Sequence, residues 1–109
     1  MTERLRTYAE FWPFYLGEHR QPATRAVHLL GTGAALILLA SAALNRDWVF
    51  IPPAIVLGYG CAWIGHAVVE RNRPATFKYP LWSLYSDVRM FALFITGRLD
   101  RELDRHGIN

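Results

Sequence analysis

Two long stretches without a charged residue dominate the middle of this chain. The first covers residues 27–44, a run of 18, and the second covers residues 48–69, a run of 22. A membrane-spanning helix needs roughly 20 mostly apolar residues, within a range of about 17–25. Residues 45–47 between the runs, Asn-Arg-Asp, form a short polar turn. The pattern predicts a transmembrane helical hairpin, and the alternative is a soluble bundle with two buried helices.

Whole-chain averages conceal this pattern. Hydrophobic residues make up 52% of the 109 residues, slightly above the range of about 45–50% in globular proteins, and the mean hydropathy is only +0.10. These averages exclude a disordered chain, and the length fits one domain over residues 1–109. We predict an all-α fold, a small integral-membrane helical bundle built on the hairpin with amphipathic flanking helices.

The flanks carry the amphipathic patterns. Residues 2–16 combine charges with aromatic and apolar side chains at helical spacing, which predicts a helix at the membrane interface that Pro13 ends or kinks. Residues 81–96 show apolar side chains at the same spacing and predict a further amphipathic or membrane helix. The charged tail over residues 97–109 is expected to be exposed.

Charge placement predicts the orientation of the hairpin. Of the 12 lysine and arginine residues, only Arg46 lies in the turn, and all others precede the first apolar run or follow the second. By the positive-inside rule, both termini and any site near them face the cytoplasm. Acidic residues are interleaved with the basic ones, so they form no basic stripe and nucleic-acid binding is not expected.

Histidines stand at the ends of both apolar runs, and a histidine in lipid needs a reason to be there. His28 lies 18 residues before Arg46 and His66 lies 20 residues after it. An antiparallel hairpin therefore sets them at similar depth, with heights that differ by about 3 Å at ~1.5 Å per residue. His19 lies nine residues before His28, across a connector that can fold back. Glu70 follows His66 by four residues and shares its helix face.

Three imidazoles and one carboxylate at one level suit Fe(II), or Zn as an alternative. The competing interpretation is that these histidines only pack or cap helix ends near the membrane surface. His106 stands in the charged tail, where a solvated side chain is expected. Arg25 and Arg73 lie near the same level and are candidates for binding a carboxylate head group. Arg73 can equally set topology and contact lipid phosphate.

Three stretches of the chain form distinctive motifs. The first is Phe14-Tyr-Leu-x-x-His19 with Pro22-Ala-Thr-Arg-x-x-His28-x-x-Gly31-Thr32. The second is Gly58-Tyr59-x-x-Ala62-Trp63-Ile64-Gly65-His66-x-x-x-Glu70-x-Asn72-x-Pro74-Ala75-Thr76-Phe77, and the third is Tyr79-Pro-Leu-Trp-Ser-Leu-x-x-Asp87-x-x-Met90-Phe91. Together they cover about residues 11–95 and resemble a small family long catalogued as a domain of unknown function. Its characterised members are the fungal 2-hydroxy-palmitic acid dioxygenases of the endoplasmic reticulum, which depend on Fe(II).

The resemblance implies a dioxygenase for the α-oxidation of 2-hydroxy fatty acids, which uses O2 and gives CO2 and the fatty acid one carbon shorter. It implies that Fe(II) is held by His19, His28 and His66. Glu70 is then a further ligand, or the catalytic group that orients an imidazole. The substrate carboxylate is assigned to Arg73 or Arg25.

The resemblance also bears on location and assembly. The chain is similar to the short bacterial-type relatives, so we expect the bacterial inner membrane with lipid around the hairpin. A homodimer is a further expectation, because two helices bury little surface in lipid. Two other classes of function stay open. One is a Zn-dependent lipid hydrolase, and the other is a non-enzymatic membrane hairpin protein with packing histidines.

Overall fold

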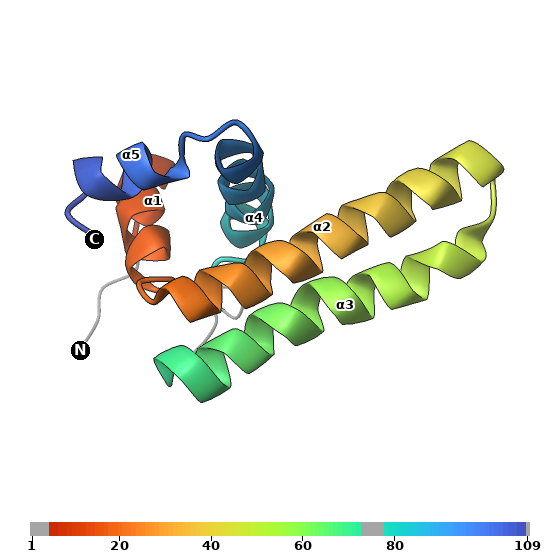
Figure 1. Cartoon of the computed structure of the whole chain (residues 1–109), viewed down its shortest axis with the longest axis horizontal. Helices are drawn as coiled ribbons and strands as arrows, with labels where there is room; N and C mark the ends of the chain where they lie inside the picture. Colours follow the sequence, from red (N-terminus) through yellow and green to blue (C-terminus); the bar gives the residue numbers. More distant parts are fainter. Residues whose placement is uncertain (1–4, 73–77, 109) are drawn as a thin grey trace.

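The computed structural model of the protein describes residues 5–72 and 78–108, and the regular structure within them is helical. Two long helical segments lie side by side as a hairpin (Figure 1). The first is α2 (Pro22–Asn45). The second comprises the 3-10 helix η1 (Trp48–Phe50), α3 (Ile51–Ile64) and the π-helical turn η2 (Gly65–Glu70). The predicted all-α bundle built on a helical hairpin is confirmed.

Local chemistry sets the ends of the hairpin helices. Pro22 lies in the first turn of α2, where its missing N–H does no harm, so this helix starts before the uncharged run. Arg46 ends α2 in the left-handed region with φ 50°, and its N–H donates to the carbonyl of Ala42. The Asp47 carboxylate then accepts from the N–H of Val49 at 3.1 Å and starts η1. Arg46 and Asp47 therefore form the polar turn, whereas Asn45, predicted to belong to it, is the last residue of α2.

Both hairpin segments expose much of their apolar surface. Pro22–Asn45 and Trp48–Glu70 are long and apolar enough to cross a membrane, and only 28% and 17% of their most apolar windows are buried. Leu30, Ile37 and Val56, for example, are 73%, 69% and 68% exposed. Buried helices of a soluble bundle would cover such side chains, so the exposure favours lipid as their surroundings.

Small residues let α2 and α3 approach closely. A Cβ atom built on Gly31 would lie 2.5 Å from Cys61 Cβ and 2.8 Å from the carbonyl oxygen of Leu57. On the facing helix, a Cβ on Gly58 would lie 3.4 Å from Ala35 Cβ. Packing between backbones is the usual way in which helices associate when no hydrophobic effect operates between them in lipid.

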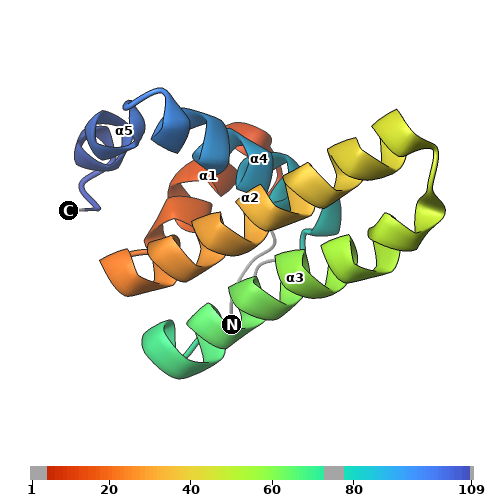
Figure 2. The ribbon, with the colours of Figure 1, turned by 45° about the vertical axis from the view of Figure 1, so that its right-hand side comes forward.

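Three further helices lie beside the half of α2 that is remote from the turn, on the side away from α3 (Figures 1 and 2): α1 (Tyr8–Gly17), α4 (Pro80–Ile95) and α5 (Leu99–Arg105). α4 runs across α2 and not along it (Figures 1 and 2). Most of the buried core residues come from these helices and join them into one unit: Phe11, Trp12, Tyr15, Leu16, Tyr79, Met90, Leu99, Leu103 and Ile108.

Two expectations for the flanks differ from the structure. The aromatic stripe of α1 does not lie at the surface, because α4 and α5 supply residues that pack against it, and Phe11 and Leu16 are fully buried. The helix also continues through Pro13 to Gly17. The charged tail forms α5, which buries Leu99 and Leu103 in the same core.

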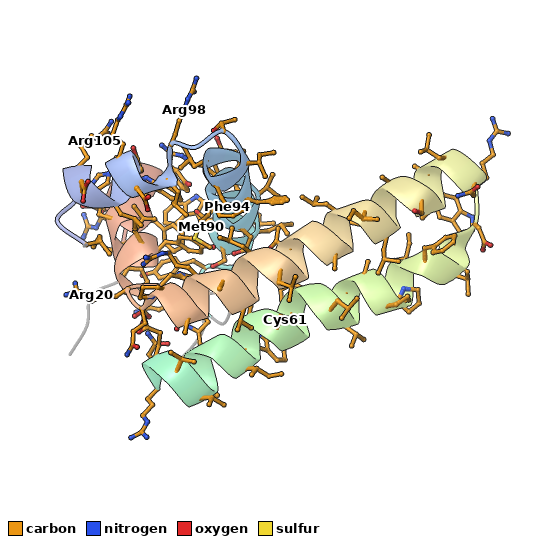
Figure 3. All side chains as sticks on the ribbon, in the orientation of Figure 1. Arg20, Cys61, Met90, Phe94, Arg98 and Arg105 are labelled. Carbon is orange, nitrogen blue, oxygen red and sulfur yellow. The ribbon has the colours of Figure 1, made fainter. Side chains whose placement is uncertain are left out.

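The first and last helices, α1 and α5, lie at the end of the molecule opposite the hairpin turn (Figure 1). Arg20, Arg98 and Arg105 lie at this end too, whereas Cys61 sits midway along the hairpin (Figure 3). The arrangement agrees with a hairpin that returns the chain to its starting side.

Candidate metal centre

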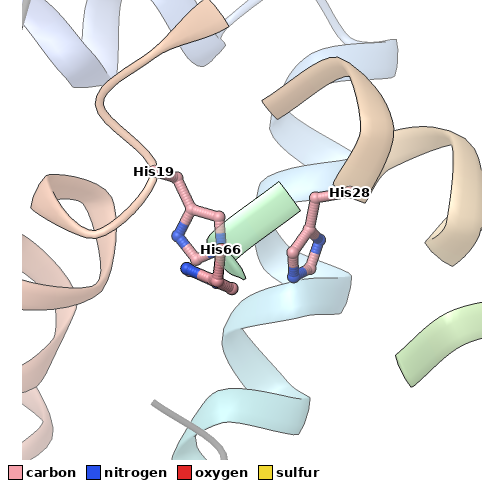
Figure 4. A group of neighbouring side chains, drawn as sticks. All are labelled: His19, His28 and His66. Carbon is pink, nitrogen blue, oxygen red and sulfur yellow. The ribbon is translucent and has the colours of Figure 1, made fainter. Parts of the chain in front are cut away.

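Three histidines from separate segments meet in the interior, at the end of the hairpin remote from the turn (Figure 4). His19 follows α1, His28 belongs to α2 and His66 belongs to η2. One ring nitrogen of each lies within 4.8 Å of the others. The three side chains are 1%, 3% and 2% exposed. Such burial of three imidazoles requires partners, and these define what the group can do.

The connector that carries His19 is fastened by backbone and side-chain bonds. The His19 N–H donates to the carbonyl of Leu16 at 3.1 Å as α1 ends. Arg25, one turn into α2, donates from Nη1 to the carbonyls of His19 at 2.9 Å and Arg20 at 2.7 Å. Arg25 therefore ties the connector to the helix that bears His28.

His66 is positioned by an irregular helix end. The π-helical turn η2 ends at Arg71, which has a left-handed φ of 59°. The chain then reverses, and the N–H of Asn72 donates to the carbonyl of His66 at 2.9 Å. π-helical turns are rare and occur frequently at functional sites, and left-handed non-glycine residues cluster there as well.

Hydrogen bonds assign the tautomers of His19 and His66. The Nδ1 of His19 lies 2.8 Å from the carbonyl oxygen of Tyr15, which can only accept, so Nδ1 carries the proton. The Nδ1 of His66 lies 2.7 Å from Asn72 Oδ1, and the amide is oriented because its Nδ2 donates to Glu18 Oε2 at 3.0 Å. In the neutral rings, both Nε2 atoms therefore present lone pairs.

These two lone pairs face each other, since His19 Nε2 and His66 Nε2 are 3.1 Å apart. Burial, and then the neighbouring His28 and His66, lowers the pKa of His19 well below its usual 6.5, so its ring is neutral near pH 7. Two acceptor nitrogens at this distance repel unless a cation lies beside them. Nδ1 atoms bound to a carbonyl and an amide oxygen are the usual outer contacts of metal-binding histidines.

His28 meets a carboxylate. Its Nε2 lies 3.1 Å from Asp87 Oδ1 on α4, and the hydroxyl of Tyr15 donates to the same oxygen at 2.5 Å. Its Nδ1 lies 3.5 Å from Thr32 Oγ1, one turn further along α2. From the sequence, Asp87 is one of several polar residues near the level of the histidines and part of the third motif stretch, but its contact with His28 was not predicted.

The outcomes for Glu70, His106 and Arg73 differ from those for the three histidines. Glu70 is not in the three-histidine group, and its Oε1 accepts from the N–H of Gln21 at 2.6 Å, the residue that precedes α2. His106 lies 3.4 Å from Glu102 on α5 and is partly buried. Arg73 lies outside the residues that the structure describes.

The donor set fits a transition metal. Neutral imidazoles bind Fe(II) and Zn well, and a buried group of three leaves further coordination positions for other molecules. The three close histidines can therefore hold a metal ion.

Comparison with known proteins agrees with this picture. The family described as 2-hydroxy-palmitic acid dioxygenase Mpo1-like matches residues 5–99, a range that includes all three histidines and Asp87. No curated protein and no solved structure matches the chain. The match spans most of the 109 residues, and the chain therefore belongs to the 2-hydroxy-palmitic acid dioxygenase Mpo1-like family.

Proposed function

We propose that the protein is an Fe(II)-dependent dioxygenase that converts a 2-hydroxy fatty acid into the fatty acid one carbon shorter. The observation that carries the proposal is the pair of facing Nε2 atoms of His19 and His66 at 3.1 Å, inside a family named for this activity. His28 completes the group of three imidazoles. When bound, Fe(II) supplies redox chemistry with O2 and open positions for oxygen atoms of the substrate.

The proposed reaction balances without a further reductant. Cleavage of the C1–C2 bond turns C1 into CO2 and the hydroxyl-bearing C2 into a new carboxyl carbon. This removes four electrons from the substrate, which is the number that O2 takes up. The substrate acid and O2 together bring five oxygen atoms, of which two end in the shorter acid, two in CO2 and one in a released water.

The protein orients the metal-binding rings and excludes bulk water from the site. Tyr15 and Asn72 hold the His19 and His66 rings in one tautomer, so their lone pairs point inward before any ligand arrives. The three side chains are almost fully buried, which keeps bulk water away from the reacting atoms.

An apolar groove supports a lipid substrate. It has a volume of about 500 Å³ and lies between α2 and α4 on the exposed side of the bundle, lined by Ala26, Leu29, Leu30, Gly33, Ala34, Ile37, Phe91 and Phe94. Volumes of about 300–1,000 Å³ are typical of small-molecule sites. Leu29 adjoins His28 in sequence, and Phe91 lies one turn beyond Asp87. An alkyl chain in this groove would lie beside the segments of α2 and α4 that carry His28 and Asp87.

The head group and membrane placement are further parts of the proposal. Arg25 and Arg73 are proposed to bind the substrate carboxylate. The bonds from Arg25 to two carbonyls use Nη1 alone, and a guanidinium has five N–H donors. The hairpin is proposed to span a bacterial inner membrane with the centre near the cytoplasmic side, and a homodimer is compatible with it.

An oxygen-dependent assay tests this function. The protein is purified without oxygen, loaded with Fe(II) and supplied with 2-hydroxypalmitate and O2. The proposal predicts the C15 acid, CO2 and one O2 consumed per acid formed, all lost in His19→Ala. Absence of the C15 acid from iron-loaded protein would contradict it. Stoichiometric Zn with hydrolysis of a lipid, or purified protein that holds no metal, would instead favour the other two classes of function.

A further inference from the structure

A carboxylate from a fourth segment touches the histidine group. Asp87 lies in the middle of α4, and its side chain is only 17% exposed. Its Oδ1 accepts the hydroxyl hydrogen of Tyr15 at 2.5 Å and lies 3.1 Å from His28 Nε2. Buried carboxylates are rarely found in an apolar helix without a specific partner. The partner here belongs to the group that can hold a metal.

The nitrogen of His28 that faces Asp87 also faces the other histidines. Thr32 stands next to Nδ1 on the same helix, at 3.5 Å. In Figure 4 one ring nitrogen of His28 points toward His19 and His66, and the other points away from them. Because Nδ1 is turned to Thr32, Nε2 is the nitrogen that would bind a metal. The same atom is the neighbour of Asp87 Oδ1.

Two separations equal the spacing of ligands on one ion. The group whose ligand atoms all lie within 4.8 Å of one another comprises the three histidines without Asp87, so Asp87 must move closer to His19 or His66 for all four side chains to share one ion. Ligand atoms at about 2.1 Å from a metal are roughly 3.0 Å apart at a right angle and roughly 3.4 Å apart at a tetrahedral angle. His19 Nε2 and His66 Nε2 are 3.1 Å apart, and His28 Nε2 and Asp87 Oδ1 are 3.1 Å apart. A metal on His28 Nε2 would remove the N–H that could donate to Asp87. It would also leave the carboxylate beside a cation, where charge favours binding.

We propose that Asp87 is the fourth protein ligand of this centre, giving three histidines and one carboxylate from four segments of the chain. The assignment rests on the proposed function only in that a metal is bound here. Tyr15 holds Oδ1 in place from α1. One negative charge offsets part of the charge of a buried divalent ion, and an octahedral ion keeps two positions open. Asp87 then takes the ligand role for which the sequence suggested Glu70.

Cobalt binding tests the assignment without any enzymatic turnover. Co(II) is titrated anaerobically into metal-free protein in detergent, and its visible absorption reports both occupancy and coordination. The matched variants are Asp87→Asn and Glu70→Gln, each of which turns one carboxylate into an amide. Circular dichroism establishes that each variant is folded, and Asp87→Glu provides a second variant that keeps a carboxylate on α4.

We expect one Co(II) per chain in the wild type. In Asp87→Asn, affinity falls by about 100-fold or more, and the absorption bands shift in position and intensity. Asp87→Glu regains at least part of the affinity. Glu70→Gln keeps the wild-type spectrum, with affinity changed by less than about threefold.

Four results would overturn the assignment. The first is that the wild type binds no Co(II), and the second is that the spectrum of Asp87→Asn is identical to that of the wild type. The third is that Asp87→Asn is unfolded and Asp87→Glu binds no Co(II). The fourth is that Glu70→Gln alters the spectrum and Asp87→Asn does not. Lower affinity with an unchanged spectrum would make Asp87 a positioning residue only. Cobalt binding as expected, in a protein that does not oxidise 2-hydroxypalmitate with Fe(II), would refute the function and leave the ligand standing.

Discussion

The Nε2 atoms of His19 and His66 lie 3.1 Å apart, and each ring is bound through Nδ1 to an oxygen acceptor. Two neutral imidazoles in this arrangement present lone pairs to one another inside the protein. The arrangement is costly without a cation and favourable with one. Tyr15, Asn72 and the backbone reversal at Arg71 hold the two rings in this arrangement. The rings are therefore already oriented as ligands before a metal binds.

Asn72 is expected to control the affinity of the centre through His66. Asn72→Ala removes the Oδ1 that binds His66 Nδ1 at 2.7 Å and frees the ring to rotate. Metal affinity should fall by about 10–100-fold. The control is Asn45→Ala at the hairpin turn, whose amide bonds to the carbonyl of Ser41. Titration with Co(II) measures both, and equal affinities for the two variants would contradict the role of Asn72.

Gly31 is expected to be intolerant of a side chain. In Gly31→Ala the new Cβ would lie 2.5 Å from Cys61 Cβ and 2.8 Å from the Leu57 carbonyl, so α2 and α3 must separate. The cost should be about 1–3 kcal/mol of unfolding free energy. Gly60→Ala is the matched control, because nothing lies within 4 Å of its Cβ position. Unfolding in detergent should rank Gly31→Ala clearly below Gly60→Ala, and the reverse order would refute the close approach.

Glu102 is expected to stabilise the core in a pH-dependent way. Burial alone would raise its pKa, but the Trp12 N–H at 2.6 Å and the nearby Arg105, His106 and Arg89 outweigh it and lower the pKa below 4.5. The stabilisation is therefore present above pH 4.5 and is lost as the pH falls through the lower, folded-state pKa.

Glu102→Gln should reduce stability by about 1 kcal/mol at pH 7, because a neutral acceptor is weaker, and by less at pH 3. Unfolding temperatures at the two pH values measure this. Asp100→Asn removes the same charge from an exposed position on the same helix and serves as control. A wild-type-like pH profile for Glu102→Gln would show that Glu102 is not the group responsible.

The groove between α2 and α4 is expected to set the preferred chain length of the substrate. Ala34→Phe places a ring in the groove, whereas Ala43→Phe places the same ring on an exposed part of α2. Ala34→Phe should raise the KM for a C16 2-hydroxy acid relative to a C8 acid, with the metal content unchanged. A chain-length preference that is the same in both variants would show that the alkyl chain lies elsewhere.

The hairpin and the meeting of His28 with His66 were predictable because they depend on local pattern. Two uncharged runs and a polar turn predict an antiparallel pair, and the similar distances of 18 and 20 residues from Arg46 then set the two histidines at nearly the same level. The core could not be placed in this way. The aromatic stripe of α1 shows that one face is apolar, but not that α4 and α5 supply the residues that cover it.

The observed contacts of the Glu70 and Asp87 carboxylates could not be predicted from the sequence. Glu70 shares the face of His66 only in a regular α-helix, and the π-helical turn with its i→i+5 bonds changes that spacing. Glu70 instead caps the start of α2 through Gln21. Asp87 meets His28 because α4 crosses α2, and this is a tertiary relationship that no spacing along the chain encodes.

Metal analysis of the purified protein tests the central claim most directly. Protein reconstituted with Fe(II) without oxygen and then desalted should retain one iron per chain. His19→Ala, His28→Ala and His66→Ala should each retain little, while His106→Ala retains as much as the wild type. Wild-type protein that holds no iron after reconstitution, or histidine variants that hold as much as the wild type, would contradict a metal centre at these three residues.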